Sequence, residues 1–196
     1  MRPSNLKLIG AIALVAAVAL GRVVLRPLVP LGNSLIMFDL FALAGISSVL
    51  AGVLLGGLYS LIVPLAAMAL SDLVLGNGPI LIFTWSGFVM MGLLGLVTRK
   101  NRAPSAAYAL SLTGIGIAGI LAFDLWTNFG WWLLFYPHTL AGLGLCYAMA
   151  LPFMIGHLLT TTAALPVVAL PLLYLEKNRA RVVRELRARL GLPAPT

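Results

Sequence analysis

DLWTNFGWWLLFYPHTLAGLGLCYAMALPF, residues Asp124–Phe153, places polar side chains inside a run that is otherwise too apolar for contact with water. The run contains an acid, an asparagine, a histidine, tyrosines and three tryptophans. Polar groups in hydrocarbon cost several kcal/mol unless other groups satisfy them, so such a cluster usually lines a site. We interpret this stretch as the rim of a small-molecule binding pocket.

The composition outside this stretch predicts an integral membrane protein. Hydrophobic residues make up 61% of the 196 residues, charged residues only 9%, and the mean hydropathy is +1.06. Soluble proteins carry roughly 25% charged residues. Because a spanning helix needs roughly 20 residues, the length allows about six or seven crossings in a single membrane domain, 1–196.

Continuous apolar runs favour helices over the strands of a barrel, which would alternate apolar and polar residues. The predicted fold class is therefore an all-α membrane protein with six transmembrane helices. Proline, glycine and basic residues punctuate the apolar runs. The expected spans are residues 6–25, 38–55, 58–75, 80–97, 106–126 and 155–175.

The distribution of basic residues along the chain favours six spans over seven. With six spans, all but Arg22 and Arg26 of the 13 lysines and arginines share one side, as the positive-inside tendency requires. The segment Thr139–Leu151 is then a short re-entrant or interfacial helix on the outer side, between Pro137 and Pro152. We expect a bacterial inner-membrane protein, multi-pass, with both termini cytoplasmic.

The net charge of +8 does not indicate nucleic acid, because the basic residues flank apolar runs, where they orient helices and contact anionic lipid. The basic tail, 176–196, begins with an amphipathic pattern that is typical of a helix on the cytoplasmic leaflet or of a solvated end of the last span.

A single cysteine, Cys146, excludes an internal disulfide and a multi-cysteine zinc site. No metal or cofactor is expected.

Under this topology most polar residues in or near the spans fall at the outer face, which predicts a pocket open to the outside. An acidic pocket favours a substrate with N–H donors or a cation. The predicted substrate-binding residues are Asp72, Asn77, Trp85, Asp124, Asn128, Trp131, Tyr136 and His138, with Trp126 as a further stacking residue. Tryptophans at interface depth also occur without any ligand, and His138 and His157 could be structural. Asp39 could only cap its helix.

A stripe of small residues lies on the first span. Gly10, Ala13, Ala17 and Gly21 fall three or four residues apart and permit a second helix to approach closely. The partner is either another helix of the same bundle or a separate membrane subunit.

Two segments carry a resemblance: VPLAAMALSDLVLG, Val63–Gly76, and TNFGWWLLFYPHTLAGLGLCYAMALPF, Thr127–Phe153. They resemble an uncharacterised bacterial membrane-protein family related to the substrate-binding S components of energy-coupling factor (ECF) vitamin transporters. That resemblance implies six helices, cytoplasmic termini, a substrate near the outer surface, and a first helix that contacts a coupling subunit through small residues. It implies that residues 26–37, 76–79 and 129–156 form the gate.

Three functions follow as hypotheses. The first is a substrate-binding membrane subunit for a vitamin-like or other small polar organic molecule, energised by a partner ATPase module, since this chain has no phosphate-binding loop. The alternative is a structural membrane subunit of an envelope-assembly complex. The third is a membrane enzyme with an acid and a histidine as an acid–base pair; the sequence has no nucleophile or metal motif to support it, so we do not expect an enzyme.

Overall fold

Every regular element in the described part of the chain is a helix. The computed structural model describes residues 3–26, 40–76, 78–101, 105–178, 181–182 and 189. The elements are α1 (Pro3–Leu25), α2 (Leu40–Leu50), the π-helical turn η2 (Ala51–Leu55), α3 (Tyr59–Leu75), α4 (Leu81–Val97), the 3-10 turn η3 (Thr98–Asn101), α5 (Ala106–Phe135) and α6 (Leu140–Lys177). The all-helical prediction is confirmed.

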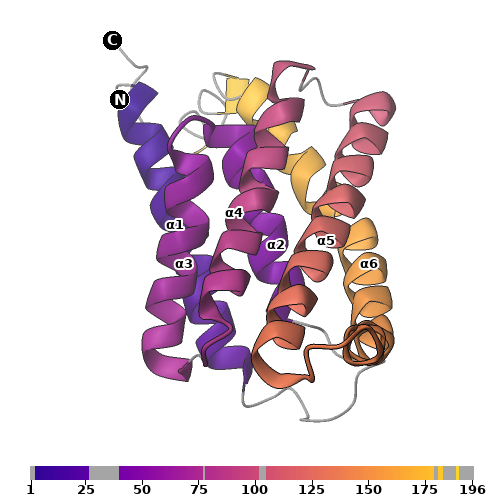
Figure 1. Cartoon of the computed structure of the whole chain (residues 1–196). Coiled ribbons are helices and arrows are strands. Elements are labelled where there is room, and N and C mark those ends of the chain that lie inside the picture. The colour runs from indigo at the N-terminus through magenta and orange to yellow at the C-terminus, as the bar shows by residue number, and fades with distance from the viewer. Residues whose placement is uncertain are drawn as a thin grey trace.

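The helices stand side by side in one bundle (Figure 1). The start of α1 and the end of α6 lie at the same end of this bundle. The opposite end, which we call the distal end, holds the ends of α3 and α5 and the starts of α4 and α6 (Figure 1).

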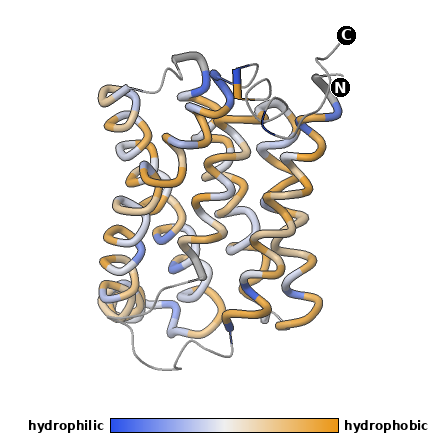
Figure 2. Tube along the Cα trace, turned by 180° about the vertical axis from the view of Figure 1, so that it is seen from behind, coloured by the Kyte–Doolittle hydropathy of each residue, from blue (hydrophilic) through white to orange (hydrophobic). Residues whose placement is uncertain are grey.

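Three helices are long and apolar enough to cross a membrane by length and composition: Asn5–Leu25, Ala106–Phe135 and Leu140–Lys177. Three further apolar helices are shorter, at 10–17 residues: Ala42–Leu55, Tyr59–Leu75 and Leu81–Val97. Most of the chain along the length of the bundle is hydrophobic, and hydrophilic positions concentrate toward its two ends (Figure 2). This distribution is typical of helices in contact with lipid.

The core lies where α2, α4, α5 and α6 meet, around Leu50, Met91, Leu112, Ile120 and Leu165, all fully buried. Aliphatic and aromatic side chains fill the space between the helices, so the bundle has a packed centre rather than a pore.

Glycines allow α4 to approach its neighbours at backbone distance. A Cβ atom on Gly92 would collide with the backbone oxygen of Ser60 in α3. A Cβ atom on Gly52 in η2 would collide with the backbone oxygen of Gly92, and one on Gly95 with that of Val49. Small residues at helix crossings are the usual device for close packing in membrane bundles.

Two predicted boundaries are wrong at the distal end. The fifth helix does not stop at residue 126 but continues to Phe135, and only Tyr136–Thr139 separates it from α6. The helix ends there because Tyr136 precedes a proline and adopts an extended backbone, with φ −115° and ψ 157°. Residues 129–156 are therefore mostly helical rather than a covering loop.

The predicted short helix Thr139–Leu151 is not separate from the last span. A single helix, α6, runs from Leu140 to Lys177 and includes Pro152, Pro166 and Pro171. Each proline removes a backbone hydrogen bond and favours a bend, but inside a bundle it need not end the helix. The first part of α6 is seen end-on at the distal end, whereas the remainder rises beside α5 (Figure 1).

The close crossing of α4 with α3 can be tested through the stability of glycine variants. Gly92→Ala is expected to lower the apparent unfolding temperature of the purified protein in detergent, because overpacking against the Ser60 carbonyl costs about 1–3 kcal/mol. Gly114→Ala is the matched control, since a Cβ atom there meets nothing within 4 Å. We expect no loss from the control, because alanine favours helix by about 1 kcal/mol. Equal behaviour of both variants contradicts the close crossing.

Candidate functional site

A pocket of about 460 Å³ lies at the distal end between α5 and α6. Ligand sites for small organic molecules have volumes of about 300–1,000 Å³, so the pocket has a suitable size. Its lining is mainly apolar, with a few polar groups. The lining residues are Thr84, Phe123, Asp124, Thr127, Asn128, Trp131, Tyr136, Cys146, Met149, Ala150, Phe153 and His157.

Helical spacing explains how α5 presents its polar residues to this pocket. Thr127, Asn128 and Trp131 follow Asp124 by three, four and seven residues, so all four lie on one face of the helix. The face is continuous because α5 extends beyond residue 126 to Phe135.

The lining residues of α6 repeat at the same kind of spacing. Cys146, Ala150, Phe153 and His157 are separated by four, three and four residues, which places them on one face. Since α6 is continuous through Pro152, His157 belongs to the same helix as the residues near Thr139 and faces α5 from it.

Asp124 and His157 form the polar centre of the pocket. Nδ1 of His157 lies 2.9 Å from Oδ1 of Asp124, and Asp124 is only 4% exposed. Oδ2 of Asp124 is buried without a hydrogen-bond partner among the described residues. A buried acceptor without a donor is costly, so Asp124 is the pocket residue whose hydrogen-bonding capacity is left unmet by the described residues.

Further hydrogen bonds hold the two helices around this pair. Asn128 donates from Nδ2 to the backbone oxygen of Asp124 at 2.7 Å, and Cys146 donates from Sγ to the backbone oxygen of Asn128 at 3.4 Å. The hydroxyl of Tyr147 donates to the backbone oxygen of Leu125 at 2.7 Å. The pocket is therefore formed by tied helices rather than by a loose loop.

Aromatic side chains cap the distal end of α5. The rings of Trp131 and Phe135 lie 4.5 Å apart. Trp132 donates from Nε1 to the backbone oxygen of Pro137 at 3.0 Å, and Nε2 of His138 lies 2.8 Å from the backbone oxygen of Leu133. These contacts fix the turn between α5 and α6, and His138 is part of that turn rather than of the pocket lining.

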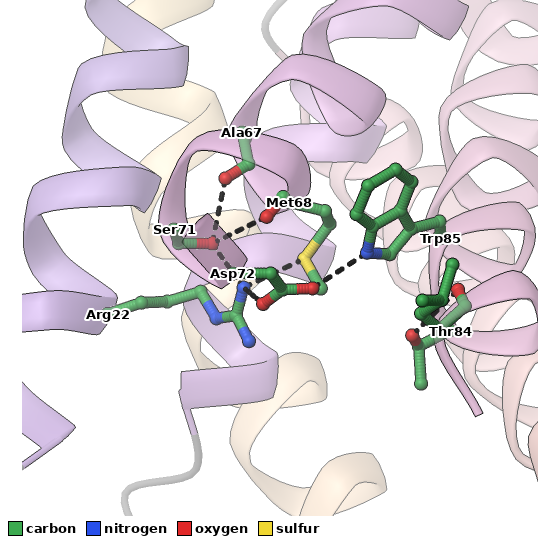
Figure 3. Close-up of polar contacts among 8 residues, drawn as sticks. Arg22, Ala67, Met68, Ser71, Asp72, Thr84 and Trp85 are labelled. Carbon is green, nitrogen blue, oxygen red and sulfur yellow. Dashed lines mark hydrogen bonds and ion pairs between the residues drawn. The ribbon is translucent and has the colours of Figure 1, made fainter. Parts of the chain in front are cut away.

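A second buried carboxylate, Asp72, lies in a different cluster that joins α1, α3 and α4 (Figure 3). Nη1 of Arg22 donates to Oδ1 of Asp72 at 2.8 Å, and Nε1 of Trp85 donates to Oδ2 at 2.7 Å. The same Nη1 contacts Oγ of Ser71 and lies 3.3 Å from Sδ of Met68. Both oxygens of Asp72 therefore have donors from this chain.

The structure brings half of the predicted binding residues into one pocket. Asp124, Asn128, Trp131 and Tyr136 line it together. Three others lie elsewhere: Asp72 and Trp85 bond to each other, and His138 lies in the α5–α6 turn. Trp126 donates from Nε1 to Oγ of Ser86 at 2.8 Å. Asn77 and Asp39 are outside the described residues. The binding roles stay predictions.

The sequence reasoning assigned no role in the pocket to His157, Cys146 or Thr84, all of which line it. A signal for the first two was present, because both continue the four-three-four spacing along α6. It was hidden by the assumption of a break at Pro152. Thr84 comes from α4, and only the tertiary arrangement shows its position. Among the described residues, no group of three His, Cys, Asp or Glu residues could hold a metal ion.

The predicted small-residue stripe on α1 divides into two parts. Gly10 and Gly21 face the bundle, since a Cβ atom on Gly10 would lie 3.2 Å from Leu55 and one on Gly21 would collide with Leu43. Ala13 and Ala17 are exposed. The stripe therefore contributes both to packing within the bundle and to an outward surface.

Comparison with known proteins finds a family model that matches most of the chain. The model of the Family of unknown function (DUF6580) matches residues 35–182, which include the whole pocket. Searches of curated proteins and of solved structures found no match.

The contribution of the Arg22–Asp72 pair to stability can be tested by removing its cation. Arg22→Met leaves the carboxylate of Asp72 buried without its cation, and breaking such a pair costs about 3–5 kcal/mol. We expect a lower unfolding temperature in detergent, and recovery of much of this loss in the Arg22→Met/Asp72→Asn double variant. Arg26→Met is the control, because Arg26 is exposed and lies one helical turn further along the chain. The pair has no structural role if Arg22→Met behaves like the control.

Proposed function

We propose that this chain, which belongs to the Family of unknown function (DUF6580), is the substrate-binding membrane subunit of an ECF-type transporter. Its substrate is a vitamin-like or other small polar organic molecule. The observation that carries the proposal is Asp124, a lining residue of a pocket of about 460 Å³, whose buried Oδ2 has no donor from the described residues. A pocket with one unsatisfied polar group and aromatic walls suits binding of a ring-bearing solute.

The proposal includes six membrane crossings, one for each of the α-helices. Helices α3 and α4 contain 17 residues each, at the lower limit of about 17–25 for a span. The 11 residues of α2 continue into the 5 residues of η2, and the two together come just short of that limit. The start of α1, the turn η3 and the end of α6 carry described basic residues and lie at one end of the bundle, which we assign to the cytoplasmic side. The distal end, with the pocket, then faces outward.

Transport requires energy from a partner. The chain has no G-x-x-x-x-G-K-[ST] phosphate loop, so we propose a transmembrane coupling subunit and an ATPase pair as partners. The exposed Ala13 and Ala17 on α1 would form the contact with the coupling subunit. The resemblance of Val63–Gly76 and Thr127–Phe153 to relatives of ECF S components supports the same assignment.

A structural subunit of an envelope-assembly complex is the second candidate. The same exposed alanines on α1 favour it, because close helix contact is also how scaffold subunits assemble. The two functions differ in what the pocket contributes, since a scaffold needs no ligand at Asp124.

Retention of a ligand tests the proposed function. Native mass spectrometry of protein purified from its host in mild detergent is expected to show a bound small molecule on the wild type. Asp124→Asn should lose most of the bound molecule, because an uncharged amide then replaces the carboxylate that accepts the ligand's hydrogen bond. Asp72→Asn is the matched control, as a second buried carboxylate outside the lining.

Two results would contradict the transport assignment. One is a wild type without bound small molecule in repeated preparations. The other is a pair of Ala13→Leu and Ala17→Leu variants that abolish the cellular function while Asp124→Asn leaves it intact, which is the pattern expected of a scaffold.

Sidedness is tested with single cysteines in a Cys146→Ser background. A membrane-impermeant maleimide added to intact cells is expected to label Leu140→Cys at the distal end, where Leu140 is 88% exposed. Ala107→Cys, exposed near the opposite end of α5, should react only after the cells are opened. The reverse pattern would place the pocket on the cytoplasmic side.

A further inference from the structure

We infer that the pocket between α5 and α6 binds a flat, ring-bearing molecule through an N–H group that donates to Oδ2 of Asp124, and that it rejects carboxylate and phosphate ligands. The inference rests on the proposed function and specifies its substrate class.

The need for a donor follows from the state of Asp124. One of its oxygens contacts His157 at 2.9 Å, whereas Oδ2 has no partner among the described residues and the residue is only 4% exposed. An ionised carboxylate only accepts hydrogen bonds. A ligand beside Asp124 satisfies this oxygen only if it supplies a hydrogen of its own. An N–H group meets this requirement and a carboxylate does not.

The charges around the pocket point the same way. No lysine or arginine is among the described residues that line it, and the lining contains one acid, Asp124. Arg22 does not line the pocket; it is paired with Asp72 in the other cluster. An anionic ligand would therefore meet a carboxylate without a compensating lysine or arginine, and like charges in a buried site are unfavourable.

The walls of the pocket define the rest of the ligand. Trp131, Phe123 and Phe153 contribute aromatic surface, and Met149 and Ala150 contribute aliphatic surface. Trp131 is 43% exposed, so part of its ring remains available for contact. Aromatic rings favour stacked or edge contacts with another ring. A planar ring that carries the N–H group near one edge satisfies both the walls and Asp124.

Two probes of the same shape and opposite chemistry test the inference. Benzamidinium presents N–H donors on a planar ring, and benzoate presents a carboxylate on the same ring. Cys146 is the single cysteine of the chain and lines the pocket, so its rate of reaction with methyl methanethiosulfonate reports occupancy. The extent of reaction is read from the intact mass of the full chain in detergent.

Benzamidinium is expected to protect Cys146 at a concentration about tenfold or more below that of benzoate, as expected for a charge-assisted hydrogen bond. Asp124→Asn should raise the protecting concentration of benzamidinium about tenfold, while Asp72→Asn leaves it unchanged. Equal protection by both probes in the wild type overturns the inference, as does an absence of protection by benzamidinium. The comparison of probes needs no variant, so it stands even if Asp124→Asn fails to fold.

The outcomes separate this inference from the proposed function. Protection by benzoate alone would refute the ligand class while a bound small molecule in native mass spectrometry still supports a substrate-binding subunit. Preference for benzamidinium without any ligand in the purified protein would support the pocket chemistry and count against the transport assignment.

Discussion

A carboxylate buried in an apolar bundle must be compensated by donors or by a cation, and the two buried aspartates of this protein are compensated to different degrees. Asp72 has donors on both oxygens, from Arg22 and from Trp85. Asp124 has His157 on one oxygen and no partner among the described residues on the other. The first arrangement is complete within the chain and joins three helices. The second leaves one oxygen without a donor from the described residues, and this is the basis of our proposal that a ligand binds there.

This difference could not be predicted from sequence. Asp72 and Asp124 have similar surroundings along the chain, since each lies within a run of mostly apolar residues. The deciding contact of Asp72 is with Arg22, 50 positions away, and that of Asp124 is with His157, 33 positions away. Apolar periodicity shows which segments are helices, but not which turns of two helices meet.

What the sequence did predict depends on simple physical rules. Apolar runs without alternation predicted helices, and Gly56 and Gly57 predicted the turn between η2 and α3. The prediction of a helix break at Pro152 was wrong, because a proline does not always end a helix. Pro152 lies inside α6, whereas Pro137 does terminate α5. The two cases differ because the residue before Pro137 adopts an extended backbone, while the backbone around Pro152 stays helical within a packed bundle.

The two polar clusters share one wall, helix α4. Trp85 donates to Asp72, and Thr84 is its neighbour on α4 (Figure 3). Thr84 also lines the pocket. The position of α4 is fixed further along by its close glycine crossing with η2 and α3. A pocket wall held in this way costs little conformational entropy when a ligand binds, because its order exists beforehand. The close glycine crossing therefore contributes to the pocket indirectly, because it holds in place the helix that supplies Thr84 to the pocket.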